Sequence, residues 1–281
     1  MDSQSHQEPA DERSATGSNP STTPRDVASA LTAALEHHRA GRLDAAETLY
    51  RLVLQQMPDS PDALHLLGLL AHQRGRHEEA INLIGAAIRL LPDAASYRSS
   101  LGTVLRAAQR HAEAVAAYRE ALRLAPGHAE THNNLGCLLK TLGRLDEARA
   151  EFSAALGIRA DYPEAHNNLG TVLRALGLGR EAVEHYQQAL RSKPDYADAL
   201  ANLGNVLNDL GRHAEAAEAL QQAIRLEPND PQVNRALGTA RAALGQLDEA
   251  EAACRDAIRC RPTAASLHVE LGAVLQRREQ W

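Results

Sequence analysis

Histidine is the residue type of this chain best suited to metal binding or proton transfer, and the chain has 13 of them. Their spacing argues against a shared metal ion. His77, His111 and His213 occupy one position of a 34-residue period, and His132 and His166 occupy another. Residues one period apart belong to successive structural units and cannot converge on one ion. No His-Glu-x-x-His motif occurs, so we expect neither a metal nor another cofactor.

The glycines and cysteines are also candidates for chemistry, because glycine-rich loops can bind phosphate and paired cysteines can bind metal or form disulfides. Gly177 and Gly179 stand in Ala-Leu-Gly-Leu-Gly-Arg, but no strand is predicted before them and no third spaced glycine follows. We therefore interpret this segment as a turn between helices and not as a phosphate-binding loop. The cysteines Cys137, Cys254 and Cys260 form no Cys-x-x-Cys pair, which is typical of reduced thiols. None of these residues predicts catalysis, and we expect the chain not to be an enzyme.

A row of amide and hydroxyl side chains is the more informative pattern. Asn134, Asn168 and Asn202 recur every 34 residues, and spacings of three and four place further polar residues on the same helix face. We call the following twelve residues the polar stripe: Thr103, Arg106, Asn133, Asn134, Lys140, Asn167, Asn168, Thr171, Arg174, Asn202, Asn205 and Asn208.

The chemistry of the polar stripe suits peptide binding. An amide side chain both donates and accepts hydrogen bonds, so a regular row of amides matches the main chain of an extended peptide. The three cations of the stripe would favour an acidic segment. The same asparagines could instead bond neighbouring helices or water, and both interpretations stay open at this point.

The elements that must position this stripe follow from an unbroken 34-residue repeat that begins near residue 26. Each repeat has a Leu-Gly pair, with alanines 12 and 19 residues after the glycine and a bulky or apolar residue 16 after it. The repeat glycines are Gly68, Gly102, Gly136, Gly170, Gly204, Gly238 and Gly272. The bulky or apolar residues are Ile84, Tyr118, Phe152, Tyr186, Leu220 and Cys254.

These residue types predict a pair of helices in each repeat. Glycine and alanine let two antiparallel helices approach closely, and we expect the bulky residue to fill the gap beside the next repeat. Proline ends the second helix in most repeats because it lacks an N–H group. A further glycine, such as Gly143, breaks the chain between the two helices, and Gln109 replaces it once. No single pair buries its apolar face, but a stack of pairs does.

This pattern resembles the tetratricopeptide repeat over roughly residues 26–281. The resemblance implies an all-α solenoid, a right-handed superhelix of tandem helix–turn–helix units whose first helices line a concave groove. We expect about seven repeats and a C-terminal half repeat, and we interpret the chain as a fragment cut within a helix pair at Trp281. Residues 1–25 are polar and aperiodic, which predicts a disordered tail.

The asparagine row is similar to the one in the repeat region of O-linked N-acetylglucosamine transferases. There, the equivalent asparagines hold the main chain of protein substrates. The similarity comprises Asn134, Asn168 and Asn202. The equivalent positions of other repeats depart from it: Leu66, Ser100, Ala236 and Glu270.

Together these patterns predict a non-catalytic scaffold that binds a partner peptide or protein segment in the groove. The alternative is the substrate-recruiting region of a larger enzyme, such as an O-linked N-acetylglucosamine transferase, whose catalytic domain is absent from this chain. A third hypothesis is self-association through the end repeats. The net charge of −6 argues against nucleic acid, and the lack of a long apolar run argues against a membrane span. Without a signal peptide, we expect a cytoplasmic protein.

Overall fold

The computed structural model describes residues 24–279, which contain fifteen α-helices and no strand. The predicted all-α class is therefore confirmed. Residues 1–23 lie outside the described part, so the disordered tail expected over residues 1–25 stays a prediction. None of the described helices is long and apolar enough to cross a membrane.

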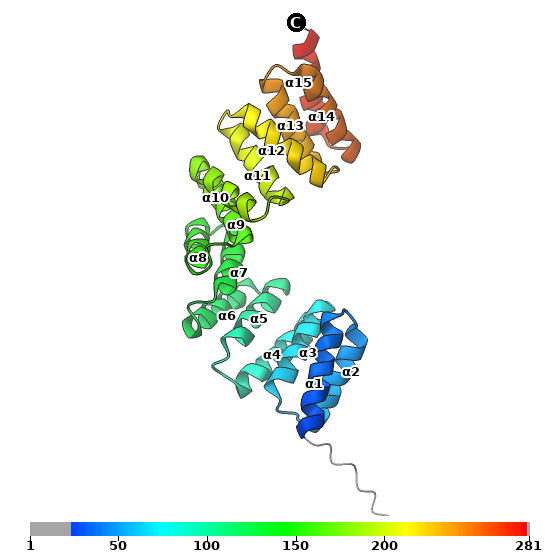
Figure 1. The fold of residues 1–281 in the computed structure, drawn as a ribbon, viewed down its shortest axis with the longest axis vertical. Helices are drawn as coiled ribbons and strands as arrows, with labels where there is room; N and C mark the ends of the chain where they lie inside the picture. Colours follow the sequence, from blue (N-terminus) through cyan, green and yellow to red (C-terminus); the bar gives the residue numbers. More distant parts are fainter. Residues whose placement is uncertain (1–23, 280–281) are drawn as a thin grey trace, which may run out of the picture. The chain divides into compact units, whose positions relative to one another are not determined.

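The chain forms two compact units, residues 1–90 and 91–281 (Figure 1). The first unit contains α1 (Pro24–Arg39), α2 (Leu43–Gln56), α3 (Pro61–Gln73) and α4 (His77–Leu90). The second unit contains α5 (Ala95–Ala107), α6 (His111–Leu124), α7 (Ala129–Thr141), α8 (Leu145–Ile158), α9 (Pro163–Ala175), α10 (Gly179–Ser192), α11 (Ala197–Asp209), α12 (His213–Leu226), α13 (Pro231–Ala243), α14 (Leu247–Cys260) and α15 (Ala265–Glu279).

Each odd-numbered helix up to α13 is the first helix of a pair and packs against the even-numbered second helix that follows it. Within the second unit, each second helix also packs against the first helix of the next pair. First helices contact one another across repeats from α5 to α13, and the described second helices make no comparable contact. In Figure 1, α7 and α9 accordingly lie on the inner side of the curve of this unit, with α8 and α10 outside.

The turns between paired helices need a residue in the left-handed backbone region. Glycine supplies it in six pairs, with φ between 71° at Gly41 and 79° at Gly177. At Gly143 the turn is closed by two backbone hydrogen bonds, in which the N–H of Gly143 donates to Lys140 at 3.0 Å and that of Arg144 donates to Leu139 at 2.9 Å. Gln109 holds the same conformation with φ of 62°, although its side chain disfavours it.

The repeat glycines inside the first helices have a different role, because the bulky residue of the same repeat lies directly on them. A Cβ atom built on Gly102 or Gly170 would come within 2.7 Å of the ring of Tyr118 or Tyr186. The sequence led us to expect this residue beside the next repeat, and the contact with its own first helix was not anticipated. Gly272 has no such neighbour within 4 Å.

The last helix, α15, is fastened to α14 by a buried carboxylate. Glu251 of α14 is only 4% exposed. Its carboxylate forms an ion pair with Arg255 at 2.5 Å and another with Arg278 of α15. Leu267 and Val274 are the residues of α15 that are buried within the described part of the chain.

Candidate functional site

The structure brings the whole polar stripe onto four consecutive first helices, α5, α7, α9 and α11. All of them belong to the second unit, each contacts the next one along the chain, and α7 and α9 lie on the inner side of the unit's curve in Figure 1. Ten of the twelve residues are at least partly exposed, whereas Asn133 and Asn167 are buried. The role of each side chain differs, however, and depends on its hydrogen bonds.

Four of the asparagines bond to one another between repeats, and we call this set the amide relay. Asn168 Nδ2 donates to Asn133 Oδ1 at 3.3 Å, and Asn202 Nδ2 donates to Asn167 Oδ1 at 3.0 Å. Asn133 and Asn167 are buried, each 8% exposed. In each bond, the accepting asparagine stands three residues before its repeat glycine, and the donating asparagine stands two residues before the glycine of the next repeat. For these residues, the neighbouring-helix interpretation is correct.

Asn167 and Asn168 make further hydrogen bonds that leave them little capacity for a ligand. Asn167 Nδ2 also donates to the Tyr196 hydroxyl at 3.3 Å. Asn168 Oδ1 accepts from Lys140 Nζ at 2.9 Å, and Asn168 Nδ2 also contacts Cys137 Sγ at 3.4 Å. These two asparagines therefore stabilise the packing of successive repeats.

Thr103 and Thr171 satisfy buried tyrosine hydroxyl groups. The Thr103 and Tyr118 hydroxyl oxygens lie 2.9 Å apart, and the Tyr186 hydroxyl donates to Thr171 at 3.4 Å. Burial raises the pKa of both tyrosines, and the bond from threonine opposes that rise. A partner peptide would have to compete for these hydroxyls, so their main role is internal.

Two of the three cations of the polar stripe, Lys140 and Arg174, also bond neighbouring side chains. Arg174 Nε donates to Asp209 Oδ2 at 2.7 Å, and Lys140 is held by an amide as described above. Arg106 is exposed and has no carboxylate partner within residues 24–279. Asn208 donates to the Ala236 carbonyl at 3.0 Å, and its Oδ1 lies 3.2 Å from His213 Nδ1.

Three carboxylates on the same helix face were missed by the sequence analysis. Glu130, Glu164 and Asp198 are exposed and lie four residues before the repeating asparagines, which places them on the same side of α7, α9 and α11. Their spacing was visible in the sequence and could have revealed them. The inner surface therefore carries both signs of charge, which weakens the expected preference for acidic segments.

Asn134 and Asn205 keep their amide groups available. Both are partly exposed, and neither side chain makes a hydrogen bond within the described residues. The carbonyl oxygen of Asn202 likewise has no partner there. These groups face the same surface, on α7 and α11. They are the part of the polar stripe best placed to bind a ligand.

The chemistry of the remaining candidate groups is limited. Burial raises the pKa of the Cys137 thiol, although Lys140 and Arg106 oppose the rise. The thiol therefore stays protonated near neutral pH, and a protonated thiol is a poor nucleophile. Across residues 24–279, no group of three or more His, Cys, Asp or Glu side chains is placed to hold a metal ion.

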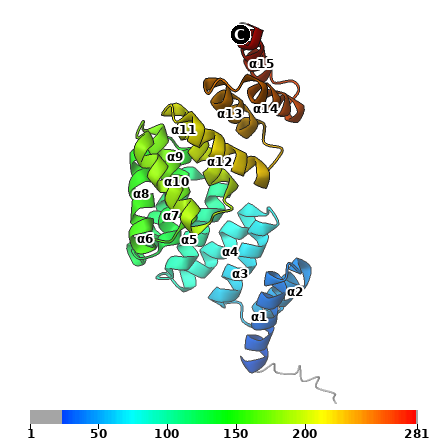
Figure 2. The same cartoon turned by 45° about the horizontal axis from the view of Figure 1, so that its top comes forward.

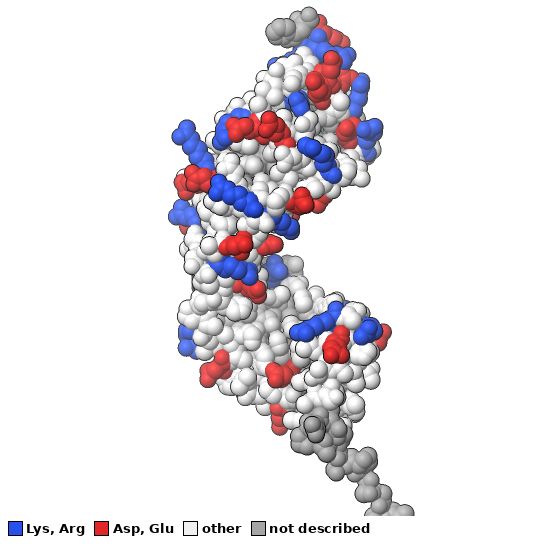
Figure 3. Space-filling model, viewed as in Figure 1, with Lys and Arg blue, Asp and Glu red and all other residues white. Residues whose placement is uncertain are grey.

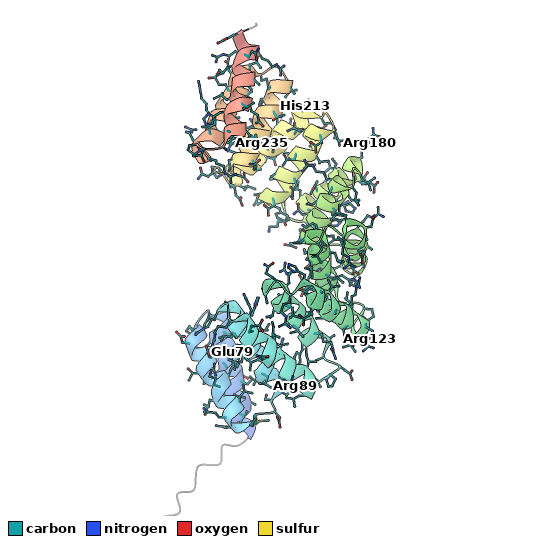
Figure 4. The ribbon with its side chains drawn as sticks, turned by 180° about the vertical axis from the view of Figure 1, so that it is seen from behind. Glu79, Arg89, Arg123, Arg180, His213 and Arg235 are labelled. Carbon is teal, nitrogen blue, oxygen red and sulfur yellow. The ribbon has the colours of Figure 1, made fainter. Side chains whose placement is uncertain are left out.

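Basic and acidic side chains are mixed on the face of the molecule that Figure 3 shows. Arg123 of α6 and Arg180 of α10 are exposed on the outer side of the second unit (Figure 4). Arg119 of α6 forms an ion pair with Glu147 of α8 at 2.9 Å, linking successive second helices.

Comparison with protein-family models finds matches described as tetratricopeptide repeat. The matched ranges are residues 37–102, 92–161, 133–197, 167–231 and 202–265. No curated protein sequence matches the chain.

Solved structures share the fold. The chain is similar to Pseudomonas aeruginosa pilF, with 21% identity and a TM-score of 0.67 over 77% of this chain and 97% of that one. It is also similar to MamA, with 24% identity and a TM-score of 0.57 over 63% and 96% of the two chains. YrrB, described as a repeat protein with an unusual peptide-binding site, has 21% identity and a TM-score of 0.59 over 70% and 97%.

Proposed function

Because this chain belongs to the tetratricopeptide-repeat family, we propose that it is a non-catalytic protein-interaction scaffold. Its binding surface is the inner face of α5, α7, α9 and α11, where the main chain of an extended partner segment lies. The observation that carries this proposal is the unsatisfied amide capacity of Asn134 and Asn205 on a surface of first helices. Partly exposed amides without partners can bond a peptide at little desolvation cost.

The amide relay gives this surface the rigidity that peptide binding benefits from. Asn133, Asn167, Asn168 and Asn202 fix the spacing of α7, α9 and α11 through side-chain bonds. A surface that is already ordered loses little conformational entropy when a partner binds. The relay would thus support binding without contacting the partner through every asparagine.

The alternative function, a substrate-recruiting region of a larger enzyme, would use the same surface. Such a region also holds the main chain of a protein substrate. It stays a hypothesis, as does self-association through the end repeats. The proposed test therefore concerns the surface itself, which both the scaffold and the recruiting region require.

The test uses peptides selected from a random display library on the immobilised full chain. We expect selected peptides to bind the double variant Asn134→Ala/Asn205→Ala at least about tenfold more weakly, since each lost hydrogen bond contributes about 1 kcal/mol. Thermal unfolding of this variant should match that of the unaltered chain, because neither amide bonds another described residue.

The matched control is Asn167→Ala, in the same stripe. This change removes both amide bonds of a buried residue and should lower the unfolding temperature. Changing Asn134, Asn168 and Asn202 together to Ala should weaken both binding and stability, because Asn168 and Asn202 also bond buried asparagines of the neighbouring repeat. Selected peptides that bind the double variant as tightly as the unaltered chain would contradict the proposed surface.

A further inference from the structure

The seventh helix pair lacks the large side chain that fills the other pairs. At the position where Tyr118, Phe152 and Tyr186 place a ring on the repeat glycine, α14 has Cys254. Its Sγ lies 2.9 Å from the place where a Cβ atom on Gly238 would stand. The thiol therefore replaces the innermost part of a ring, and the space of the outer part is left open.

A cavity of about 280 Å³ lies at this position, between α13, α14 and α15. Its lining includes Gly238, Thr239, Cys254, Ala273 and Val274. An apolar cavity of about 150 Å³ is large enough to hold a benzene ring. Thr239 is exposed as well as lining the cavity, so the cavity opens to solvent there. Figure 2 shows the three helices packed together at the C-terminal end of the second unit.

Thr239 shows which ring the cavity suits. Thr171, its equivalent in the fifth pair, donates to the Asn167 carbonyl at 3.0 Å and accepts from the Tyr186 hydroxyl. Thr239 donates to the Arg235 carbonyl at 3.2 Å in the same way. Its oxygen is left with acceptor capacity, but the tyrosine that would use it is absent. Thr239 is therefore placed to accept a hydrogen bond from a phenol hydroxyl, but its own repeat has no tyrosine to donate one.

The fourth pair supports the link between the position of Thr239 and the position of the ring that lies on the repeat glycine. There the ring belongs to Phe152, which has no hydroxyl group, and the equivalent of Thr239 is Cys137. Threonine accompanies tyrosine in the third and fifth pairs, where the two hydroxyl groups bond. In the seventh pair it accompanies only the small Cys254.

We propose that the cavity between α13, α14 and α15 binds a hydroxyphenyl group supplied from outside the chain. The ring lies against Gly238, Cys254 and Val274, and its hydroxyl donates to Thr239 Oγ1. Either a small free phenol or the tyrosine side chain of a partner protein can supply this group. The proposal concerns α13–α15 and does not depend on the peptide surface of α5–α11.

The cavity lining contains one carboxylate, Glu270, and one guanidinium, Arg277, so its charges balance and suit a ligand of no net charge. Burial, together with the nearby carboxylate of Glu270, raises the pKa of the Cys254 thiol. The thiol is therefore neutral and presents a polarizable apolar surface to the ring. Glu270 itself forms an ion pair with Arg235 at 3.3 Å.

The test is a titration of the full chain with 4-methylphenol and, in parallel, with toluene, followed by protein NMR. We expect 4-methylphenol to shift the resonances of Gly238, Thr239 and Val274, and to bind about five- to tenfold more tightly than toluene, because only the phenol can donate to Thr239. Thr239→Val should abolish this difference and leave toluene binding unchanged. Equal affinities in the unaltered chain would overturn the role of Thr239.

A second variant tests the cavity itself. Cys254→Tyr restores the residue of the third and fifth pairs, so it should fill the cavity and abolish binding of both compounds. Alkylation of the unaltered chain, mapped by mass spectrometry, gives a readout that does not depend on this variant folding. Saturating 4-methylphenol should slow alkylation of Cys254 and leave the exposed Cys260 unaffected. Undiminished alkylation of Cys254 at saturation, or undiminished binding by a folded Cys254→Tyr chain, would overturn the site.

The source of the ring is decided by adding the capped peptides Gly-Tyr-Gly and Gly-Phe-Gly. Binding of the tyrosine peptide, and not of the phenylalanine peptide, assigns the site to a partner tyrosine. Binding of 4-methylphenol alone assigns it to a small free phenol. Failure of both 4-methylphenol and the tyrosine peptide to bind refutes the proposal.

Discussion

Gln109 occupies a turn position that glycine fills in the other six pairs, and it does so with a φ of 62°. A left-handed conformation costs a non-glycine residue roughly 1–2 kcal/mol, which glycine avoids at some cost in unfolded-state entropy. We therefore expect Gln109→Gly to raise the free energy of unfolding by about 0.5–1 kcal/mol in urea denaturation. Gln109→Ala is the control and should bring no gain. A glycine variant no more stable than the alanine variant would argue against strain at this turn.

We expect His65 of α3 to lower the free energy of unfolding in acid. Burial lowers its pKa to about 4, although Asp62 opposes the shift. The unfolded chain takes up a proton at His65 near pH 6.5, whereas the folded chain does so only near pH 4. The free energy of unfolding should therefore fall as the pH drops from about 6.5 to 4, by at most about 3 kcal/mol.

The check on His65 is a comparison of urea midpoints at pH 7 and pH 4.5 in the unaltered chain and in His65→Asn. Asparagine stands at the equivalent positions of α7 and α9, so the packing should tolerate it. The variant should lose less stability between the two pH values. An identical loss in both chains would place the acid sensitivity elsewhere, for example at His166 and His185, whose pKa values burial also lowers.

At the scale of single residues, the sequence predicted which helices carry the asparagines but not which groups they bond. The 34-residue spacing placed Asn133, Asn134 and Asn168 correctly on first helices. The bond from Asn168 to Asn133 depends on how one repeat is rotated against the next, and spacing within one helix does not report that rotation. The pairing of Thr103 with Tyr118 likewise depends on the distance between two helices.

At the scale of the helix pair, the repeat glycines control how closely first and second helices approach. Gly170→Leu would drive a side chain into the ring of Tyr186, so we expect it to lower the free energy of unfolding by roughly 1–3 kcal/mol or more. Chemical denaturation measures this directly. Gly272→Leu is the matched control, because nothing lies within 4 Å of that position and leucine is the better helix former. Equal destabilisation by the two changes would contradict this explanation.

The helix pairs themselves were largely predictable, because each needs only local signals. The Leu-Gly pair and the two alanines mark the contact between helices, while a turn glycine and a proline mark their ends. Ala34 stands 34 residues before Gly68, where the first repeat would have its glycine, and it is fully buried. The cavity beside Cys254 was not recognised. We interpreted that residue as a filler, whereas its small volume leaves space.

At the scale of the whole molecule, stability in a repeat array is carried by contacts between neighbours. Within the described residues α15 packs mainly against α14, with an ion pair from Glu270 to Arg235 of α13, and has only Leu267 and Val274 buried. We expect native-state hydrogen exchange to be roughly tenfold or more faster in α15 than in α13, which has neighbours on both sides. Glu251→Gln should speed exchange in α15 further and leave α7 and α9 unchanged. Uniform exchange along the second unit would contradict this gradient.

The periodic pattern predicted the solenoid but not the division into two compact units. The repeat register runs without interruption through residues 90–91, where the structure divides. A regular register reports that units stack and says little about how strongly each one packs. The cytoplasmic location, the partner and the disordered tail stay predictions from the sequence.

The amide relay has a consequence for how such a gene can change by copying or losing whole repeats. Asn167 faces Asn202, while Ala201 and Ala236 stand at the matching positions one repeat later. Tandem duplication of residues 163–196 would again set an asparagine against an asparagine. Excision of residues 197–230 would set Asn167 against Ala236 and leave a buried carbonyl oxygen without a donor, at a cost of about 1–3 kcal/mol. The amide relay therefore tolerates duplication of this repeat but disfavours removal of the next one.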